Sequence, residues 1–145
     1  GGTPASVDGL DGHFYEPTLF TDVTPDMTIA QEEIFGPVLA TFEVGSYDEA
    51  VTVANDTQYG LSSSIYTQDV NKSFRAMRDL EAGITYVNGP TIGAEAHMPF
   101  GGVKDTGNGQ RDGGYAAFEF WTEHKTLYVD YSGQLQKAQM DSVED

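Results

Sequence analysis

The sequence predicts an α/β fold: an open, mostly parallel sheet with flanking helices, and one further strand near the end of the chain. Strand-like and helix-like segments alternate between residues 39 and 87 at the spacing of parallel βαβ units. Two of these segments begin with residues that cap helices. Residues 125–131 alternate apolar and polar side chains, which is the pattern of a half-exposed strand.

The first part of the chain predicts two strands and a helix. Residues 14–23 alternate loosely, and a proline within them indicates an edge strand or an irregular start. Residues 39–44 form the next predicted strand. Ser46 and Glu49 have the spacing of a capping box, so a helix should run from there to about Asn55. Its expected buried side chains are Ala50, Val51 and Ala54.

The second part of the chain predicts a strand, a helix and another strand. Residues 61–66 form a strand, and Asp69 or Asn71 caps the helix that follows. Gly83 is the natural C-terminal stop of this helix, and residues 84–87 form a short strand. The expected apolar face of the helix consists of Val70, Phe74, Met77 and Leu80.

Residues 89–112 are rich in glycine and proline and are long for a connection in a compact domain. Long loops of this kind are usually functional, and closely spaced glycines let the backbone pass near other groups. A short helix over 115–121 and the strand over 125–131 follow. The residues after Ser132 are polar and form either a frayed tail or a docked arm.

Length and charge limit the possible functions. The 145 residues are enough for one domain with a core. A net charge of −16 disfavours binding to nucleic acid or to anionic membrane surfaces. The sequence contains neither a membrane-spanning apolar run nor a signal-peptide pattern, so we expect a cytoplasmic protein. The acidic surface with only four lysines indicates a halophile, the alternative being an acidic mesophilic protein.

The residue inventory argues against a catalytic thiol or a metal site within this chain. Because it contains no cysteine, disulfides, thiolate metal ligands and thiol catalysis are excluded here. His13, His97 and His124 lack the spacing of metal ligands, and we expect them to be structural or surface residues. We therefore assign no catalytic residue and no metal ligand.

Two motifs carry a family resemblance. Residues 31–38 read QEEIFGPV, and residues 99–102 read PFGG. Together with the order of the other segments, they make residues 3–131 resemble the C-terminal part of the catalytic domain of an aldehyde dehydrogenase. The resemblance implies that Glu33 binds the ribose of NAD or NADP, since a carboxylate can accept from both vicinal hydroxyls. It also implies that Phe35 contacts the nicotinamide region. The alternative is a surface Glu pair ahead of a turn at Gly36-Pro37.

The resemblance also assigns the substrate side. It implies that Phe100 and Ile92 contact the aldehyde, whereas ordinary loop packing is the alternative for Phe100. We interpret Asn88 as a residue that caps its strand end, and Lys104 as structural. The motif around Ile92 and the residues after Val129 resemble the α-ketoglutarate semialdehyde dehydrogenase branch of the family.

The resemblance implies further parts outside this chain. The family attacks the aldehyde with a cysteine and hydrolyses the thioester with a general-base glutamate, and both are expected upstream of Gly1. We expect residues 1–122 to belong to the catalytic domain and residues 123–145 to form an oligomerisation arm and a polar tail. The arm implies a homo-oligomer, a dimer or a tetramer, whereas the alternative for residues 125–131 is an ordinary edge strand of the same chain. The alternative function is a non-catalytic remnant, or a partner subunit that acts as a binding or oligomerisation module.

Overall fold

The strands of this protein form three separate two-stranded sheets in the computed structural model, which describes residues 1–134. The pairs are β1 (Pro4–Ala5) with β2 (Phe14–Tyr15), β3 (Thr18–Phe20) with β4 (Val38–Ala40), and β5 (Ser62–Ile65) with β6 (Ile84–Val87). The first pair is antiparallel and the other two are parallel. The predicted α/β class and the parallel pairing are confirmed, although these strands pair two by two instead of forming one open sheet.

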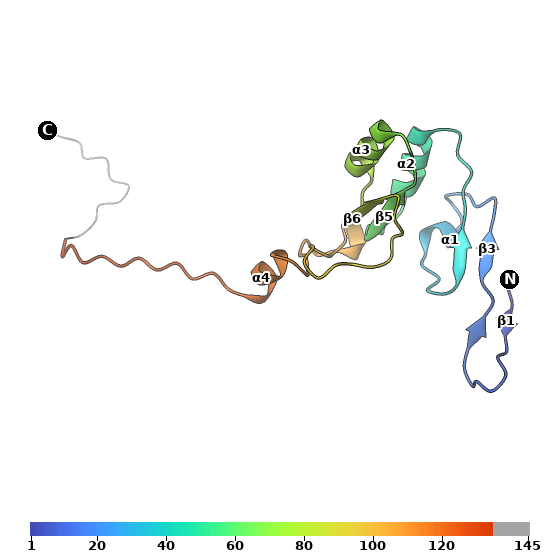
Figure 1. Ribbon diagram of the computed structural model, residues 1–145, viewed down its shortest axis with the longest axis horizontal. Coiled ribbons are helices and arrows are strands. Elements are labelled where there is room, and N and C mark those ends of the chain that lie inside the picture. The colour runs from blue at the N-terminus through green and yellow to red at the C-terminus, as the bar shows by residue number, and fades with distance from the viewer. Residues whose placement is uncertain (135–145) are drawn as a thin grey trace.

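The elements follow one another along an elongated molecule (Figure 1). The strands β1 to β4 lie at one end with the short helix α1 (Thr28–Gln31). The helices α2 (Tyr47–Asn55) and α3 (Val70–Asp79) pack together beside β5 and β6. The 3₁₀ turn η1 (Lys104–Thr106) and the helix α4 (Ala116–Trp121) follow.

The predicted capping box starts α2. The Ser46 hydroxyl accepts from the amide of Glu49 at 3.1 Å, and the Glu49 carboxylate accepts from the amide of Gly45 at 2.7 Å. The first bond satisfies a donor that the first turn of a helix leaves free, and the second ties the residue before the cap to the same turn. Of the side chains expected to be buried, Ala50 and Val51 are half-buried and Ala54 is exposed.

The helix α3 begins at the predicted cap but turns a different face inward. The Asp69 carboxylate accepts from the amides of the second and third following residues, so Asp69 and not Asn71 is the cap. The buried side chains are Ser73 and Ala76, whereas Phe74 of the expected apolar face is 67% exposed. Small side chains let α3 approach α2 and β6 closely, and this contact decides which face points inward.

The expected core is much smaller than the chain length predicts. Among residues 1–134, Val23 and Ala76 are the only buried apolar side chains. The first two pairs leave large apolar side chains such as Tyr15, Leu19 and Leu39 exposed, whereas those of β5 and β6 are half-buried, because no further strand or helix of the described chain covers both faces of a pair.

The predicted strand over 125–131 does not form in the described chain. The backbone beyond α4 has no regular structure up to Gln134, and Figure 1 shows it running away from the other elements. A strand requires a partner that satisfies its amide and carbonyl groups, and no described segment pairs with these residues. The last part of the predicted polar tail, residues 135–145, lies outside the described residues. None of the helices described is long and apolar enough to cross a bilayer.

Asn88 closes the end of β6 with its side chain. Its backbone adopts φ of 54°, in the left-handed region that asparagine tolerates better than most residues. The side-chain oxygen accepts from the amide of Thr67 at 2.8 Å, and the side-chain nitrogen donates to the carbonyl of Thr67 at 2.9 Å. The structural interpretation of Asn88 is therefore confirmed.

We predict that Asn88→Ala loosens the connection between β5 and α3. The substitution removes both side-chain hydrogen bonds and places alanine in the left-handed region, so the opening free energy should fall by about 1–3 kcal/mol. Hydrogen exchange of amides 66–69 in the protein at its natural length measures the change. Asn88→Gly is the control, because glycine keeps the backbone freedom and loses only the hydrogen bonds. Exchange as slow in Asn88→Ala as in the unsubstituted protein would contradict this account.

Candidate functional site

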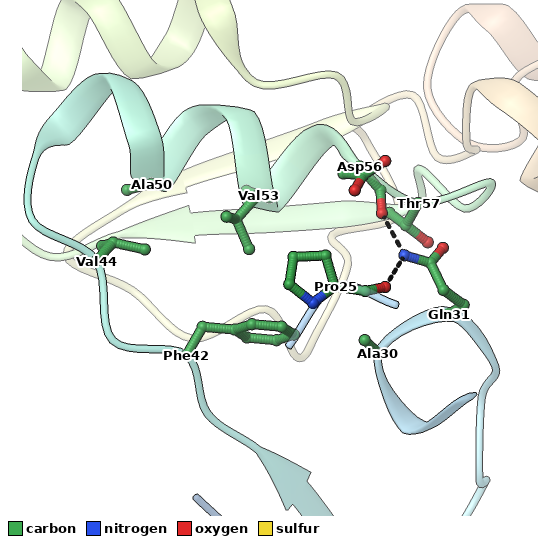
Figure 2. Close-up of a pocket in the computed structure, with 10 residues that line it drawn as sticks. Pro25, Ala30, Gln31, Phe42, Val44, Ala50, Val53, Asp56 and Thr57 are labelled. Atoms are coloured by element: carbon green, nitrogen blue, oxygen red, sulfur yellow. Dashed lines mark hydrogen bonds between the residues drawn. The ribbon is translucent and has the colours of Figure 1, made fainter. Parts of the chain in front are cut away.

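The segment that carries Glu33 and Phe35 begins at the last residue of α1. This helix has only four residues and no side-chain cap at its start, so little within it fixes its position. The Gln31 amide donates instead to the carbonyls of Pro25 and Asp56, both at 2.9 Å (Figure 2). Gln31 thus joins the start of the motif to the C-terminal end of α2.

Glu33 lies at an open pocket of about 330 Å³. Its other walls come from the C-terminal end of α2, the start of β5 and the turn before β6, including Asn55, Gly60, Leu61 and Glu81. The Glu33 side chain is exposed, and no described residue donates a hydrogen bond to its carboxylate. The carboxylate is therefore available to accept hydrogen bonds from a bound molecule.

Phe35 combines a strained backbone with an exposed ring. Its φ is 54°, a region that costs a bulky residue free energy, and its side chain is 91% exposed. Within the described chain, the Phe35 ring therefore contributes almost no free energy of burial at this position. The strain and the exposure together indicate that the ring is placed to contact something outside this chain's own packing.

Phe100 lies in the glycine-rich loop and lines a second pocket. Its backbone exchanges two hydrogen bonds with Asp112, which fixes the middle of the loop beside its C-terminal end. The Phe100 ring is 38% exposed at a pocket of about 500 Å³ that is also bordered by Leu61 and Phe120. Leu61 borders the Glu33 pocket as well, so the two pockets meet at the start of β5.

The glycines allow the close backbone contacts that the sequence indicates. A Cβ atom on Gly83 would lie 1.8 Å from the carbonyl oxygen of Gly101, and one on Gly107 would lie 2.0 Å from that of Gly102. No side chain fits in these contacts, so glycine is required for the loop to lie against β6 and to fold back on itself.

Ile92 lies at a third and larger pocket. Its side chain is 79% exposed, and the pocket, of about 840 Å³, has the first residues of β6 as its opposite wall. The loop that carries Ile92 is held by hydroxyl groups from the strands. They donate to carbonyls of alternate loop residues: Ser64 to Gly89 at 2.6 Å, Ser62 to Thr91 at 3.5 Å, and Tyr86 to Gly93 at 2.5 Å.

The structure thus places three of the predicted site residues at three pockets, of which those of Glu33 and Phe100 share Leu61, while Phe35 projects from the surface next to Glu33. Sequence reasoning missed Gln31 and Leu61 as residues of the site, and it missed the serines of β5. A row of three serines in a strand, residues 62–64, was the available signal, because an apolar side chain is more usual there. The described residues contain no group of His, Asp and Glu side chains arranged to hold a metal ion.

Comparison with known proteins decides the family. The sequence profile of the aldehyde dehydrogenase family matches residues 1–127. The chain belongs to the aldehyde dehydrogenase family. The resemblance on motifs 31–38 and 99–102 is therefore confirmed at the level of the family.

Individual aldehyde dehydrogenases match over most of this chain. The α-ketoglutarate semialdehyde dehydrogenase of Haloferax volcanii is 50% identical over 132 residues, which are 90% of this chain and 27% of that protein. The betaine aldehyde dehydrogenase of Brucella anthropi is 44% identical over 131 residues, 90% of this chain and 26% of its own.

The fold matches solved aldehyde dehydrogenases as well. The indole-3-acetaldehyde dehydrogenase of P. syringae, in complex with NAD+ and IAA, superposes with a TM-score of 0.81 at 41% identity. The match covers 89% of this chain and 26% of that one. The chain therefore spans about a quarter of the length of the relatives it matches.

We predict that Ser64→Ala frees the loop that carries Ile92. The variant removes the bond to the Gly89 carbonyl, which should speed hydrogen exchange of amides 91–95 about five- to tenfold, equivalent to about 1 kcal/mol. Ser73→Ala is the matched control, because it removes a hydroxyl-to-carbonyl bond within α3, away from the loop. Equal exchange in both variants would show that the Ser64 hydroxyl does not hold the loop.

Proposed function

We propose that this chain is the C-terminal part of an NAD(P)-dependent aldehyde dehydrogenase that oxidises an aldehyde to a carboxylate. Membership of the family supports the reaction class. The observation that carries the proposal is the pair formed by Glu33, with a carboxylate free to accept hydrogen bonds, and Phe35, whose exposed ring is held at φ of 54°. Both features fit a segment built to meet a cofactor.

The residues of this chain fit the binding of a dinucleotide. The Glu33 carboxylate would accept hydrogen bonds from the ribose hydroxyls, and the Phe35 ring would lie against the nicotinamide end. When bound, the nicotinamide supplies the acceptor for the hydride that leaves the aldehyde carbon. Phe100 and Ile92 would contact the aldehyde from the two neighbouring loops.

The covalent step needs a residue that this chain lacks. We propose that a cysteine outside this sequence adds as a thiolate to the aldehyde carbon, forming a carbon–sulfur bond. Loss of hydride leaves a thioester, and water activated by a glutamate base cleaves it to release the carboxylate and regenerate the thiol. The absence of cysteine from the 145 residues is the reason for placing this group elsewhere.

The proposed substrate is α-ketoglutarate semialdehyde. Identity of 50% to an enzyme of that name supports it, whereas identity of 44% to a betaine aldehyde dehydrogenase supports the other candidate, betaine aldehyde. The two differ in charge, since one carries a carboxylate and the other a quaternary ammonium group. Formation of reduced cofactor with each aldehyde, compared as kcat/KM, decides between them.

We also propose that residues 1–122 belong to the catalytic domain and that residues 123–145 form an arm and tail that join a second copy of the chain. The support is the alternating pattern of residues 125–131 and the exposure of their apolar side chains, Leu127, Val129 and Tyr131. An extended segment of this kind can add to the edge of another sheet. The protein would then be a homodimer or homotetramer.

We predict that Glu33→Gln weakens use of the nicotinamide cofactor. The amide accepts less strongly than the carboxylate, so kcat/KM for the cofactor should fall about 10- to 100-fold, equivalent to about 1.5–3 kcal/mol. Single-turnover hydride transfer and cofactor titration measure the effect. Glu32→Gln is the control, because it removes the same charge one residue away. Unchanged single-turnover rates in Glu33→Gln would remove Glu33 from this role.

The alternative is a non-catalytic remnant, or a subunit that completes the site of another chain. The intact mass of the protein from its natural source separates these possibilities. A subunit of about 50 kDa, the size of a two-domain protein, supports an enzyme of which this chain is a part. A subunit near the 15.7 kDa of this sequence would overturn the proposal. Activity that appears only after a second, cysteine-bearing chain is added would identify the completing subunit.

We further propose that the acidic surface is an adaptation to high salt. At molar salt, charge repulsion is screened within about 3 Å, so a net charge of −16 destabilises the fold less than at low salt. We predict that the melting temperature rises between low and molar KCl. Repeating the measurement with sucrose separates screening from general exclusion of solute from the surface. A melting temperature that stays constant across the KCl series would argue for an acidic mesophilic protein.

A further inference from the structure

Three consecutive backbone carbonyls at the C-terminal end of α2 receive hydrogen bonds from two distant segments. We call the carbonyls of residues 55–57 the carbonyl hub. The ammonium group of Lys104 donates to the carbonyls of Asn55 at 2.6 Å and Thr57 at 3.1 Å. The amide of Gln31 donates to the carbonyl between them, that of Asp56, at 2.9 Å. Carbonyls at a helix end lack partners within the helix and carry partial negative charge, which favours these donors.

Gln31, one of the two donors, lies in the segment that carries the proposed cofactor residues Glu33 and Phe35. Gln31 precedes Glu33 by two residues and Phe35 by four, and its second bond, to the Pro25 carbonyl, holds the other end of α1. Figure 2 shows the Gln31 amide between the two carbonyls, at the rim of an apolar pocket formed by side chains such as Phe42 and Val53. Gln31 is therefore a direct side-chain link between the segment of Glu33 and the end of α2, in addition to the pairing of β3 with β4 on either side of that segment.

Lys104, the other donor, lies in the loop that carries the proposed substrate residue Phe100. Lys104 follows Phe100 by four residues and has φ of 52°, so other contacts must hold its backbone in the left-handed region. Its side chain is only 23% exposed and also forms an ion pair with Glu81 at 2.9 Å. These three contacts hold the glycine-rich loop against α2 and against the turn before β6, together with backbone bonds from Val103 to Gly60 at 2.9 Å and from Asp105 to Gln58 at 3.0 Å.

The hub itself is held in place by Asn55. The side-chain nitrogen of Asn55 donates to the carbonyl of Asp79 at 2.8 Å, and its oxygen accepts from the amide of Glu81 at 2.9 Å. These bonds join the end of α2 to the end of α3. Both donors of the hub therefore attach to a support that cannot shift without moving α3 and β6.

We propose that Gln31 and Lys104 are positioning residues that set the cofactor side of the site, Glu33 and Phe35, against the substrate side, Phe100, through the carbonyl hub. This inference rests on the proposed function. Hydride transfer requires the reacting carbon and the nicotinamide to be aligned closely, so a small shift of either segment should slow the chemical step more than it weakens binding of the distant parts of each ligand.

The test uses the enzyme at its natural length with methionine variants. Methionine keeps most of the side-chain length and removes the hydrogen-bond donors. We expect Gln31→Met and Lys104→Met each to slow single-turnover hydride transfer at saturating cofactor and aldehyde by about 10- to 100-fold. Both ligands remain bound at saturation, but the reacting carbon and the nicotinamide are no longer aligned. The matched controls are Gln58→Met, beside the hub, and Lys72→Met, on α3, whose side chains lie outside the hub and outside the three pockets of the site.

The double variant distinguishes a shared hub from two independent effects. Once one segment has shifted, the second substitution should add little, so the combined slowing should be well below the product of the two single effects. A double variant that slows transfer by the full product would overturn the shared hub. Hydride transfer at the rate of the unsubstituted enzyme in either single variant would also overturn the proposal.

Loss of folding is kept separate from loss of positioning. If a methionine variant melts at a much lower temperature, the milder Gln31→Asn and Lys104→Arg replace it, since both keep donors but change their reach. Slowed transfer in these variants supports the proposal, and normal transfer contradicts it. If the unsubstituted enzyme forms no reduced cofactor with any aldehyde, the proposed function fails instead, which is a different result from an active enzyme that tolerates Gln31→Met.

Discussion

The C-terminal end of α2 is the support on which the candidate site depends. The short helix α1 and the 3₁₀ turn η1 are too short to hold their segments by their own hydrogen bonds. Both are attached to residues 55–57 by polar side chains, one from Gln31 and one from Lys104. Directional hydrogen bonds thus hold these two segments in place, a role that an apolar core has in most domains. Because the bonds have defined directions, they set the orientation of the site as well as its position.

The apolar surface of the chain has the opposite character. Large side chains on α3, on α4 and beyond it are exposed, and few residues among 1–134 are buried. Exposed apolar area of this extent is typical of a surface that packs against other protein. It fits the proposals that this chain folds together with a larger catalytic domain and that the segment over 125–131 joins a second copy. The chain spans about a quarter of the length of its relatives. Under these proposals, most of the surface that covers the exposed apolar side chains would come from the rest of the catalytic domain.

Features set by neighbouring residues could be predicted from the sequence. The capping box at Ser46 and Glu49 and the cap at Asp69 are local, since each bond spans two or three residues. The helices and the parallel strands follow from periodicity, and the fold class follows from their alternation. The family follows from the motifs around Glu33 and Phe100. The strand over 125–131 was predicted by the same reasoning and is not formed, because alternation describes a strand that pairs, and pairing depends on a partner.

By itself, then, the sequence determined the local elements and the family. The tertiary structure alone decided which faces point inward and which side chains hold the site together. Ser73 and Ala76 replace the expected apolar face of α3, because close approach to α2 and β6 selects small side chains. The bonds from Gln31 and Lys104 to the carbonyl hub join residues 25 to 49 positions apart in the chain. No local pattern encodes such contacts, since they exist only once the helices have packed.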